Sequence, residues 1–401
     1  MEVKIEKLDN YGKGITYLND KICFVENALP GEFVQIEIKK ENKKYIEARV
    51  VSYKKKASNR IVEKCAYSSF CGGCQLNHIN YDDENKFKEE KVRDILKKFV
   101  NIDFDIIKSI VYHERNHYRN KVILRGKNGK LGYYKNKSNE IIPITGCLLV
   151  NKRINKIISI LNQINVNIEE VIIKTSNDQS QVMVSISGEV SDGSLLLQYC
   201  DVLILNGRYL SSKKYIETKI GDKKYQESIQ SFFQINTTLT KDLYDEVFNQ
   251  IKGNRYQIVL DLYCGTGTIG IYVSGECDKI ISIDCSFSNI EDAKNNAVLN
   301  KTDNIEFICD KVENRIDKIK GVDAIIVDPP RAGLDKKTTS YLKELNALKI
   351  IYVSCDLITL ARDLKNLSDI YDIKYIKPFN MFPRTYHVEC ISVLERKSVE
   401  K

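Results

Sequence analysis

The sequence predicts an α/β protein whose C-terminal part is a doubly wound domain with a parallel sheet. The first observation is a series of short apolar runs that alternate with helix-length amphipathic segments after residue 231. These runs are Ile258–Leu260, Ile280–Ile283, Ala324–Val327 and Ile350–Val353. The second observation is a Gly-rich turn directly after the first run. The third is a different pattern in residues 1–53, where apolar and polar residues alternate with period two, as in a small β barrel or sandwich.

The composition predicts a cytoplasmic protein with two or three domains. The chain has 401 residues, of which 43% are hydrophobic, so each domain has enough apolar material for a core. Neither an apolar run long enough to cross a bilayer nor the apolar segment of a secretory signal is present. We therefore expect no membrane association, and we expect the twelve cysteines to be reduced thiols that are free to bind metal or to do chemistry.

Three domains are expected, over residues 1–56, 57–230 and 231–401. The first is the small barrel, and a basic segment over 54–60 is expected to link it to the second. The second begins with a cysteine-rich loop. A helix over 82–100 follows, because Phe87, Val92, Ile95, Leu96 and Phe99 recur at helical spacing. Strand-like runs dominate the rest of this mixed domain, with one helix over 152–163.

The Gly-rich turn has the pattern G-x-G-x-x-G from Gly265 to Gly270. Gly265 and Gly267 let the backbone turn tightly and approach a ligand, while the next helix presents its N-terminal amides. Taken alone, the motif fits a dinucleotide, S-adenosylmethionine or a turn without a ligand. Two acids favour S-adenosylmethionine. Asp261 can accept a hydrogen bond from the cofactor's amino group, and Asp284 follows at the spacing of an acid that binds ribose hydroxyls.

A rigid turn is expected where the apolar run over 322–327 meets Asp328, Pro329, Pro330 and Arg331. Because two prolines cannot continue a central strand, the chain leaves the sheet at its carboxyl edge, where ligands of α/β domains bind. The turn either reverses the chain only, or it also fixes Asp328 beside a planar substrate and the cofactor.

Cys355 directly follows another buried run, again at the ligand edge of the sheet. A lone cysteine is more often an inert core residue than a nucleophile. The segment over 379–389 changes this interpretation, because it carries Arg384, His387 and Glu389 before it enters an apolar strand. A nucleophile, a base and a methyl donor would then share one cleft.

Four motifs, in this order and spacing, resemble those of the S-adenosylmethionine-dependent RNA uracil-5 methyltransferases. They are Asp-Leu-Tyr-Cys-Gly-Thr-Gly, Asp-Pro-Pro-Arg-Ala-Gly, Tyr-Val-Ser-Cys-Asp and Phe-Pro-Arg-Thr-Tyr-His-Val-Glu. The likeness covers essentially the whole chain and implies a Rossmann-like class I methyltransferase domain. It implies that Cys355 is the nucleophile, that Glu389 removes a proton and that Phe232 stacks on the target base. The residues implied to bind the cofactor are Gln234, Tyr263, Asp284 and Asp328.

The chain departs from the family pattern at two positions. Asp356 stands after the cysteine where Asn is usual, and Arg384 replaces a residue that is commonly Gln, His or Tyr. We expect neither to change the proposed chemical roles. A negative charge on Asp356 would raise the pKa of the neighbouring thiol.

Cys65, Cys71 and Cys74 are spaced closely enough to bind one metal centre, with glycines that let the loop wrap around it. A fourth thiol is needed, and the spacing alone does not choose between zinc, an iron–sulfur centre and unligated cysteines. The family resemblance implies a 4Fe-4S cluster, and Cys147 matches its fourth ligand. Because methyl transfer needs no electrons, we expect such a cluster to be structural or to shape the RNA site.

The basic character of the chain, +8 overall, is concentrated outside the C-terminal domain. Residues 86–153 hold 17 Lys and Arg against 7 Asp and Glu, and aromatics such as Tyr118, Tyr133 and Tyr134 are interleaved with the cations. This pattern suits stacking on unpaired bases and contact with phosphates. An ordinary solvated surface is the alternative, above all for the helix over 82–100. The N-terminal barrel resembles the TRAM domain, an OB-like RNA-binding module.

These observations lead to one principal hypothesis and two alternatives. We expect a monomeric enzyme that methylates carbon 5 of a uridine in 23S ribosomal RNA, because family members with both a TRAM domain and the cysteines are mostly ribosomal enzymes. The first alternative is a methyltransferase that acts on the T-loop uridine of tRNA. The second is a non-catalytic RNA-binding iron–sulfur protein, which would need neither Cys355 nor Glu389.

Overall fold

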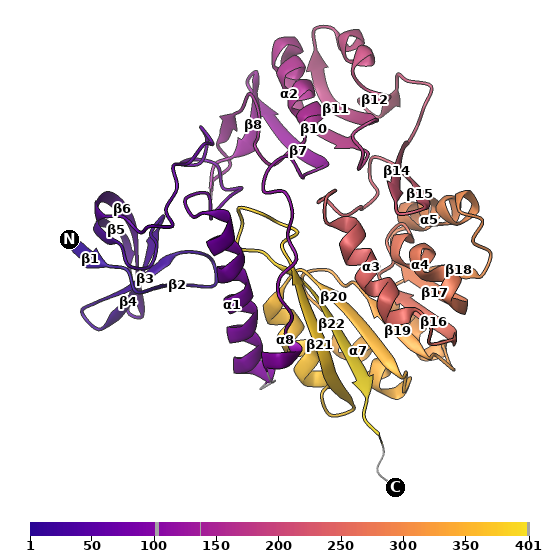
Figure 1. Ribbon diagram of the computed structural model, residues 1–401. Helices are drawn as coiled ribbons and strands as arrows, with labels where there is room; N and C mark the ends of the chain where they lie inside the picture. The colour runs from indigo at the N-terminus through magenta and orange to yellow at the C-terminus, as the bar shows by residue number, and fades with distance from the viewer. Residues whose placement is uncertain (101–103, 137, 399–401) are drawn as a thin grey trace.

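The computed structural model describes residues 1–100, 104–136 and 138–398 (Figure 1). Its N-terminal part is a six-stranded sheet in the order β1-β5-β6-β4-β3-β2. The strands are β1 (Glu2–Lys4), β2 (Lys7–Leu8), β3 (Gly14–Leu18), β4 (Lys21–Glu26), β5 (Phe33–Glu41) and β6 (Tyr45–Lys55). The sheet closes because the two residues between β1 and β2 bond to segments from its two opposite edges. The amide of Ile5 donates to Glu32 O, next to β5, and the amide of Glu6 donates to Ile15 O in β3, each at 2.9 Å. The expected barrel is confirmed.

The segment over 54–60 is bound to this barrel instead of linking it freely to the next domain. Strand β6 includes Lys54 and Lys55, and the Arg60 guanidinium contacts the fully buried carboxylate of Glu32, at 2.5 Å from Nε to Oε1. The basic residues predicted a linker over this segment, and its Arg60 is paired with the buried acid of the turn before β5.

Helix α1 (Tyr81–Val100) confirms the predicted helix and packs on the C-terminal domain, where Figure 1 shows it beside α8 (Leu357–Leu367). Val92, Ile95 and Leu96 are buried in the same core as Leu360 and Leu364. The short helix η1 (Phe104–Ile106) follows.

The middle of the chain forms a second sheet in the order β13-β12-β11-β10-β7-β8-β9, with helix α2 (Lys152–Ile164) packed against it. Asn151 caps α2 by accepting a hydrogen bond from the amide of Ile154, as the sequence favours at a helix start. The strands are β7 (Lys121–Lys127), β8 (Lys130–Tyr134), β9 (Ile141–Pro143), β10 (Asn165–Thr175), β11 (Val182–Val190), β12 (Val202–Leu205) and β13 (Arg208–Tyr209). The helix η2 (Gly193–Gln198) follows β11. The strands β14 (Ile216–Ile220) and β15 (Lys223–Glu227) form a separate two-stranded hairpin, whose Ile220 and Tyr225 are buried in a core of the C-terminal domain.

The C-terminal domain is a seven-stranded sheet in the order β18-β17-β16-β19-β20-β22-β21, flanked by helices. Its strands are β16 (Tyr256–Leu262), β17 (Cys277–Asp284), β18 (Ile305–Cys309), β19 (Ala324–Val327), β20 (Lys349–Ser354), β21 (Tyr371–Phe379) and β22 (Glu389–Arg396). The other elements are α3 (Thr240–Ile251), α4 (Thr268–Val273), η3 (Ser274–Glu276), α5 (Phe287–Leu299), α6 (Val312–Arg315), η4 (Ile316–Lys318) and α7 (Lys336–Glu344). The strand order reverses between β16 and β19, which is where doubly wound domains bind ligands.

The sheet is parallel from β18 to β20, as predicted, but β22 runs antiparallel to both of its neighbours, β20 and β21. Strand β22 runs against β20 with Ser354 opposite Cys390. This direction places the start of β22 next to the end of β20, at the ligand edge. No helix among the described residues is long and apolar enough to cross a membrane.

Candidate active site

The Gly-rich turn lies between β16 and α4 and contains three residues with positive φ. Tyr263, Gly265 and Gly267 have φ angles of 61°, 54° and 73°. A Cβ atom on Gly267 would lie 2.9 Å from the Phe307 ring, so only glycine fits the observed packing. Burial raises the pKa of the Tyr263 phenol to about 12, so this side chain is a neutral polar group at the turn.

The two acids of the predicted cofactor site flank this turn. The half-buried carboxylate of Asp284 accepts hydrogen bonds from the amides of Gly265 at 3.0 Å and Ser286 at 2.8 Å. Asp261 is 1% exposed, and burial raises its pKa to about 7, with the charge of Asp328 acting in the same direction. Its carboxylate accepts a weak hydrogen bond from the Ser282 hydroxyl at 3.5 Å, and the backbone amide of Gly270 also donates to it. The structure therefore brings both acids to the carboxyl ends of β16 and β17.

Asp328 follows β19 on the same edge of the sheet. Its amide donates to the carbonyl of Leu262 at 3.3 Å, which ties the turn to the end of β16. Gly333 N–H donates to Pro330 O at 2.8 Å and closes the proline turn. The pKa of the Asp328 carboxyl is raised because the surrounding protein removes much of its water.

Cys355 lies at the end of β20 and is half-buried. Burial raises the pKa of its thiol to about 12, and the negative charges of Glu389, Asp328 and Asp356 contribute in the same direction. The effect expected for Asp356 is present, but it is the smallest of these causes. Asp356 caps α8, where its carboxylate accepts hydrogen bonds from two backbone amides at 3.0 Å each.

Glu389 begins β22, and Cys355 follows directly after β20, so both lie one residue beyond the last pair of these two strands, Ser354 with Cys390. Directly opposed residues of antiparallel strands share one face of the sheet. Glu389 is 3% exposed, and its pKa is raised well above the usual range, first by burial and then by the charge of Asp328. A carboxyl group with a raised pKa is a stronger base when ionised.

The sequence reasoning missed Arg331. Its positive charge lowers the pKa of both the Cys355 thiol and the Glu389 carboxyl, so it stabilises the ionised forms of the two proposed catalytic groups. It also lowers the pKa of His387, which burial reduces to about 4. His387 is thus a neutral ring in this structure. The available signal was the position of Arg331 directly after the proline pair of the Asp328 turn.

Phe232 and Gln234 lie on the segment between β15 and α3. Phe232 is 58% exposed, as a base-stacking ring requires, whereas Gln234 is buried. The segment touches the Gly-rich turn, because the Thr266 hydroxyl donates to Phe232 O at 3.4 Å. It is also held by the buried ammonium of Lys174, which donates to Ser231 O at 2.6 Å. The sequence signal for this contact was a charged residue, Lys174, within the apolar strand β10.

The four predicted cluster ligands line one cavity of about 400 Å³. Cys65, Cys71 and Cys74 come from the loop before α1, and Cys147 comes from the segment between β9 and α2. None of these thiols forms a disulfide. In the described part of the chain, however, no group of three or more Cys, His, Asp or Glu is arranged closely enough to hold a metal ion. The donor set, four thiols around one cavity, is one that both a tetrahedral zinc ion and an iron–sulfur cluster use.

Comparisons with known proteins agree with this geometry. Residues 201–397 match the model of the tRNA (Uracil-5-)-methyltransferase family, and residues 1–51 match the TRAM domain. A protein of Caldanaerobacter subterraneus subsp. tengcongensis, named an uncharacterized RNA methyltransferase, is 32% identical over 98% of this chain and 98% of its own. A protein of Clostridium acetobutylicum with the same description is 31% identical over 98% of this chain and 96% of its own.

A solved structure is similar along nearly the whole chain. It is the Pyrococcus abyssi tRNA (uracil-54, C5)-methyltransferase in complex with S-adenosyl-L-homocysteine, with a TM-score of 0.81 and 25% identity. The match covers 98% of this chain and 100% of that one. Fold and site together define an S-adenosylmethionine-dependent class I methyltransferase with an N-terminal TRAM domain. The chain belongs to the RNA (uracil-5-)-methyltransferase family, so the resemblance seen in its motifs is confirmed.

Proposed function

We propose that this enzyme transfers the methyl group of S-adenosylmethionine to carbon 5 of a uridine in 23S ribosomal RNA, with Cys355 as nucleophile and Glu389 as base. The observation that carries the proposal is the placement of these two side chains. Cys355 follows the end of β20 and Glu389 begins the neighbouring strand β22, at the edge of the sheet that also holds Asp328 and the Gly-rich turn. A binding module would need neither group.

The proposed steps follow from the chemistry of uracil, whose carbon 5 is a poor nucleophile. The Cys355 thiolate adds to carbon 6, and the ring becomes an enolate. Carbon 5 then attacks the sulfonium methyl group, which leaves S-adenosylhomocysteine. Glu389 takes the proton from carbon 5, and the electron pair of that C–H bond restores the double bond as the thiolate departs from carbon 6. Because the pKa of the free thiol is raised even though the charge of Arg331 opposes this, RNA binding must favour the thiolate.

We propose that the cofactor is held by the residues around the reversal of strand order. Asp284 would bind the ribose hydroxyls and Asp261 the amino group, while Gly265 and Gly267 let the backbone approach. Gln234, Tyr263 and Asp328 would complete the site. Phe232 would stack on the target base, a role that its exposure supports.

The cysteine cavity would hold a 4Fe-4S cluster with Cys65, Cys71, Cys74 and Cys147 as ligands. Such a cluster would link the loop before α1 to the segment before α2 through its bonds to the four cysteines. Methyl transfer does not require the cluster to transfer electrons. The proposed domain boundaries remain 1–56, 57–230 and 231–401.

A tRNA substrate is the second candidate, favoured by the match to the Pyrococcus abyssi enzyme. One experiment separates the candidates: purified protein is incubated with tritiated S-adenosylmethionine and total RNA from a strain that lacks the gene, and 5-methyluridine is mapped. Label in 23S RNA supports the proposal, and label confined to tRNA supports the second candidate. Absence of label in both, with intact protein, would refute both and support a non-catalytic RNA-binding protein.

A further inference from the structure

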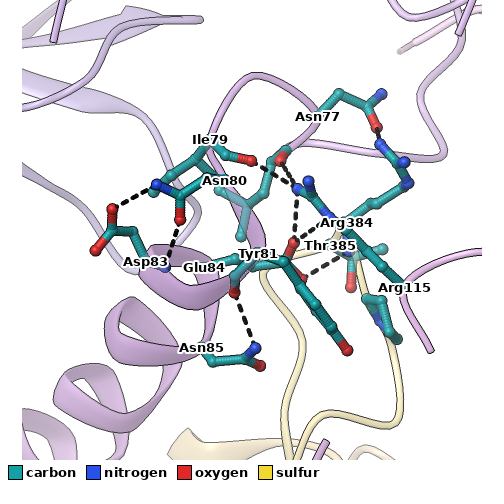
Figure 2. Close-up of polar contacts among 12 residues, drawn as sticks. Asn77, Ile79, Asn80, Tyr81, Asp83, Glu84, Asn85, Arg115, Arg384 and Thr385 are labelled. Carbon is teal, nitrogen blue, oxygen red and sulfur yellow. Dashed lines mark hydrogen bonds and ion pairs between the residues drawn. The ribbon is translucent and has the colours of Figure 1, made fainter. Parts of the chain in front are cut away.

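The connection between β21 and β22 is held by groups from α1, a helix for which the sequence left a solvated surface as the alternative to RNA contact. Glu84 and Lys88 are both fully buried, with 3.2 Å between Nζ and Oε1. The Glu84 carboxylate accepts a hydrogen bond from the backbone amide of Arg384 at 2.7 Å, drawn in Figure 2. The Lys88 ammonium donates to Asn380 Oδ1 at 2.6 Å and to Phe382 O at 3.0 Å. One ion pair thus binds this connection at three places.

The carboxylate of Glu84 cannot be replaced by a neutral group without loss of contacts. It also receives the Arg115 guanidinium, at 2.9 Å from Nη2 to Oε2, and Arg115 in turn donates to the carbonyls of Leu76 and Ile79 (Figure 2). One buried cation, Lys88, and one partly buried cation, Arg115, therefore surround one buried anion. Removal of the anion would leave the Lys88 ammonium buried without its counter-charge, which is costly. A buried ion pair is weak evidence for stability, but it can specify one conformation.

Arg384 shows that the connection is held in a defined conformation. Its φ is 68°, a left-handed value that a residue with a Cβ adopts only when its surroundings impose it. Both of its backbone groups are bound: the amide to Glu84, and the carbonyl to the amides of Gln75 at 3.0 Å and Leu76 at 2.9 Å. Its guanidinium donates to Asn77 and Asn116. The cysteine loop and α1 therefore hold the same residue from two sides.

Glu389 lies at the end of this connection. Strand pairing places its backbone opposite Phe379, and the charges that act on its carboxylate are those of Asp328 and Arg331 in the turn after β19. Lys91, one turn further along α1, donates to Tyr386 O at 2.8 Å and extends the same contact toward Glu389. The face of α1 formed by Glu84, Lys88 and Lys91 thus contacts the connection over most of its length.

We propose that Glu84 and Lys88 are positioning residues for methyl transfer, which hold residues 380–386 so that the carboxylate of Glu389 faces carbon 5 of the bound base. This inference rests on the proposed role of Glu389. A displaced base would leave nucleophilic addition and methyl transfer intact and would slow proton removal, so the covalent enzyme–RNA intermediate would accumulate. A merely structural role would affect all steps and the binding of both substrates.

The test uses E84Q, which keeps the shape but removes the charge, and K88M, which removes the donor. We expect kcat to fall about tenfold to a hundredfold, with the Kd for S-adenosylmethionine and the KM for RNA changed less than about twofold. An SDS-resistant protein–RNA band should accumulate during turnover. The matched control is E89Q, on the same helix, whose partner is the surface residue Arg93 at 2.8 Å. It should behave as the wild type.

The alternatives are distinguishable. Wild-type kcat in folded E84Q and K88M, or a reduced kcat with raised KM values and no covalent band, would overturn the proposal. If one variant does not fold, the other decides, and if neither folds, the pair is structural and the proposal fails. Failure of the underlying function is seen separately: E389Q would then form no covalent band, whatever the α1 variants do.

Discussion

The backbone amide of Gly265 donates a hydrogen bond to the carboxylate of Asp284 over 3.0 Å, so the Gly-rich turn after β16 is tied to the end of β17. Asp284 also accepts from the amide of Ser286 and the side chain of Asn289, at 2.8 and 3.2 Å. One carboxylate therefore shapes the turn and orients the start of α5. A cofactor that binds this acid would meet a side chain that is already fixed.

Asp284→Ala should weaken S-adenosylmethionine binding about tenfold to a hundredfold, because hydrogen bonds to a charged acceptor are lost together with the shape of the turn. Isothermal titration calorimetry measures the change. Asp278→Asn is the control, since Asp278 is an exposed residue at the other end of the same strand. Equal affinities of the Asp284 variant and the wild type would refute the assigned cofactor site.

S-adenosylmethionine affinity should rise as the pH increases from about 6 to about 8. The pKa of Asp261 is raised to about 7, and that of Asp328 is raised as well, so both carboxyls are partly protonated at neutral pH in the free protein. A cationic ligand favours their ionised forms, so binding below this range must release protons and is weaker. Titrations at both pH values test this. Asp328→Asn should reduce the change in affinity with pH. An affinity of the wild type that does not change with pH would contradict the prediction.

Cys355→Ser should lower turnover about a thousandfold or more, because a hydroxyl is a far weaker nucleophile than a thiolate at neutral pH. Tritium transfer to RNA measures the loss. Cofactor affinity, determined in parallel, should stay close to that of the wild type. Cys309→Ser, at an exposed position on β18, is the matched control. Full turnover by the Cys355 variant would exclude the covalent mechanism.

Glu389→Gln should trap the enzyme on RNA, since the methylated adduct forms but its proton is not removed. The adduct is detected as a band that survives denaturing electrophoresis and carries tritium from the methyl donor. Glu395→Gln, at the far end of the same strand, should form no such band. A Glu389 variant that turns over normally would assign proton removal to another base.

Anaerobically purified protein should contain about four iron and four sulfide per chain. Cys147→Ser should lose most of both, because the fourth thiol of the cavity is then absent. Cys309→Ser should retain them. Colourless wild-type protein without iron, or protein that contains zinc instead, would refute the cluster assignment.

The catalytic part of the fold was predictable because its signals are local. Each parallel strand is a continuous apolar run, and Asp261, Asp284 and Cys355 follow or end such runs, so their shared edge follows from the topology. The direction of β22 was not predictable in this way. An apolar strand pattern does not tell which way the strand runs, although that direction is what brings Glu389 to the end of β20 that Cys355 follows.

The face of α1 was predicted less well, for a different physical reason. Helical spacing identified Val92, Ile95 and Leu96 as buried, but Phe99 of the same set is 39% exposed. Glu84 and Lys88 are fully buried instead. Charged side chains are buried only where partners compensate them, and here those partners lie far along the chain, in the connection before β22. A periodicity calculated within one helix does not contain that information.

The pairing of Ser354 with Cys390 has a consequence for how this site can fail. Side chains alternate between the two faces of a strand, so a slip of β22 by one residue along β20 would turn Glu389 to the opposite face of the sheet. The enzyme would keep its helices, the number of its core residues and its cofactor turn, yet the base would lie on the other face of the sheet from the nucleophile. The alignment of two neighbouring strands is thus itself a component of the catalyst, and insertions or deletions between Leu367 and Glu389 are tolerated only where they preserve it.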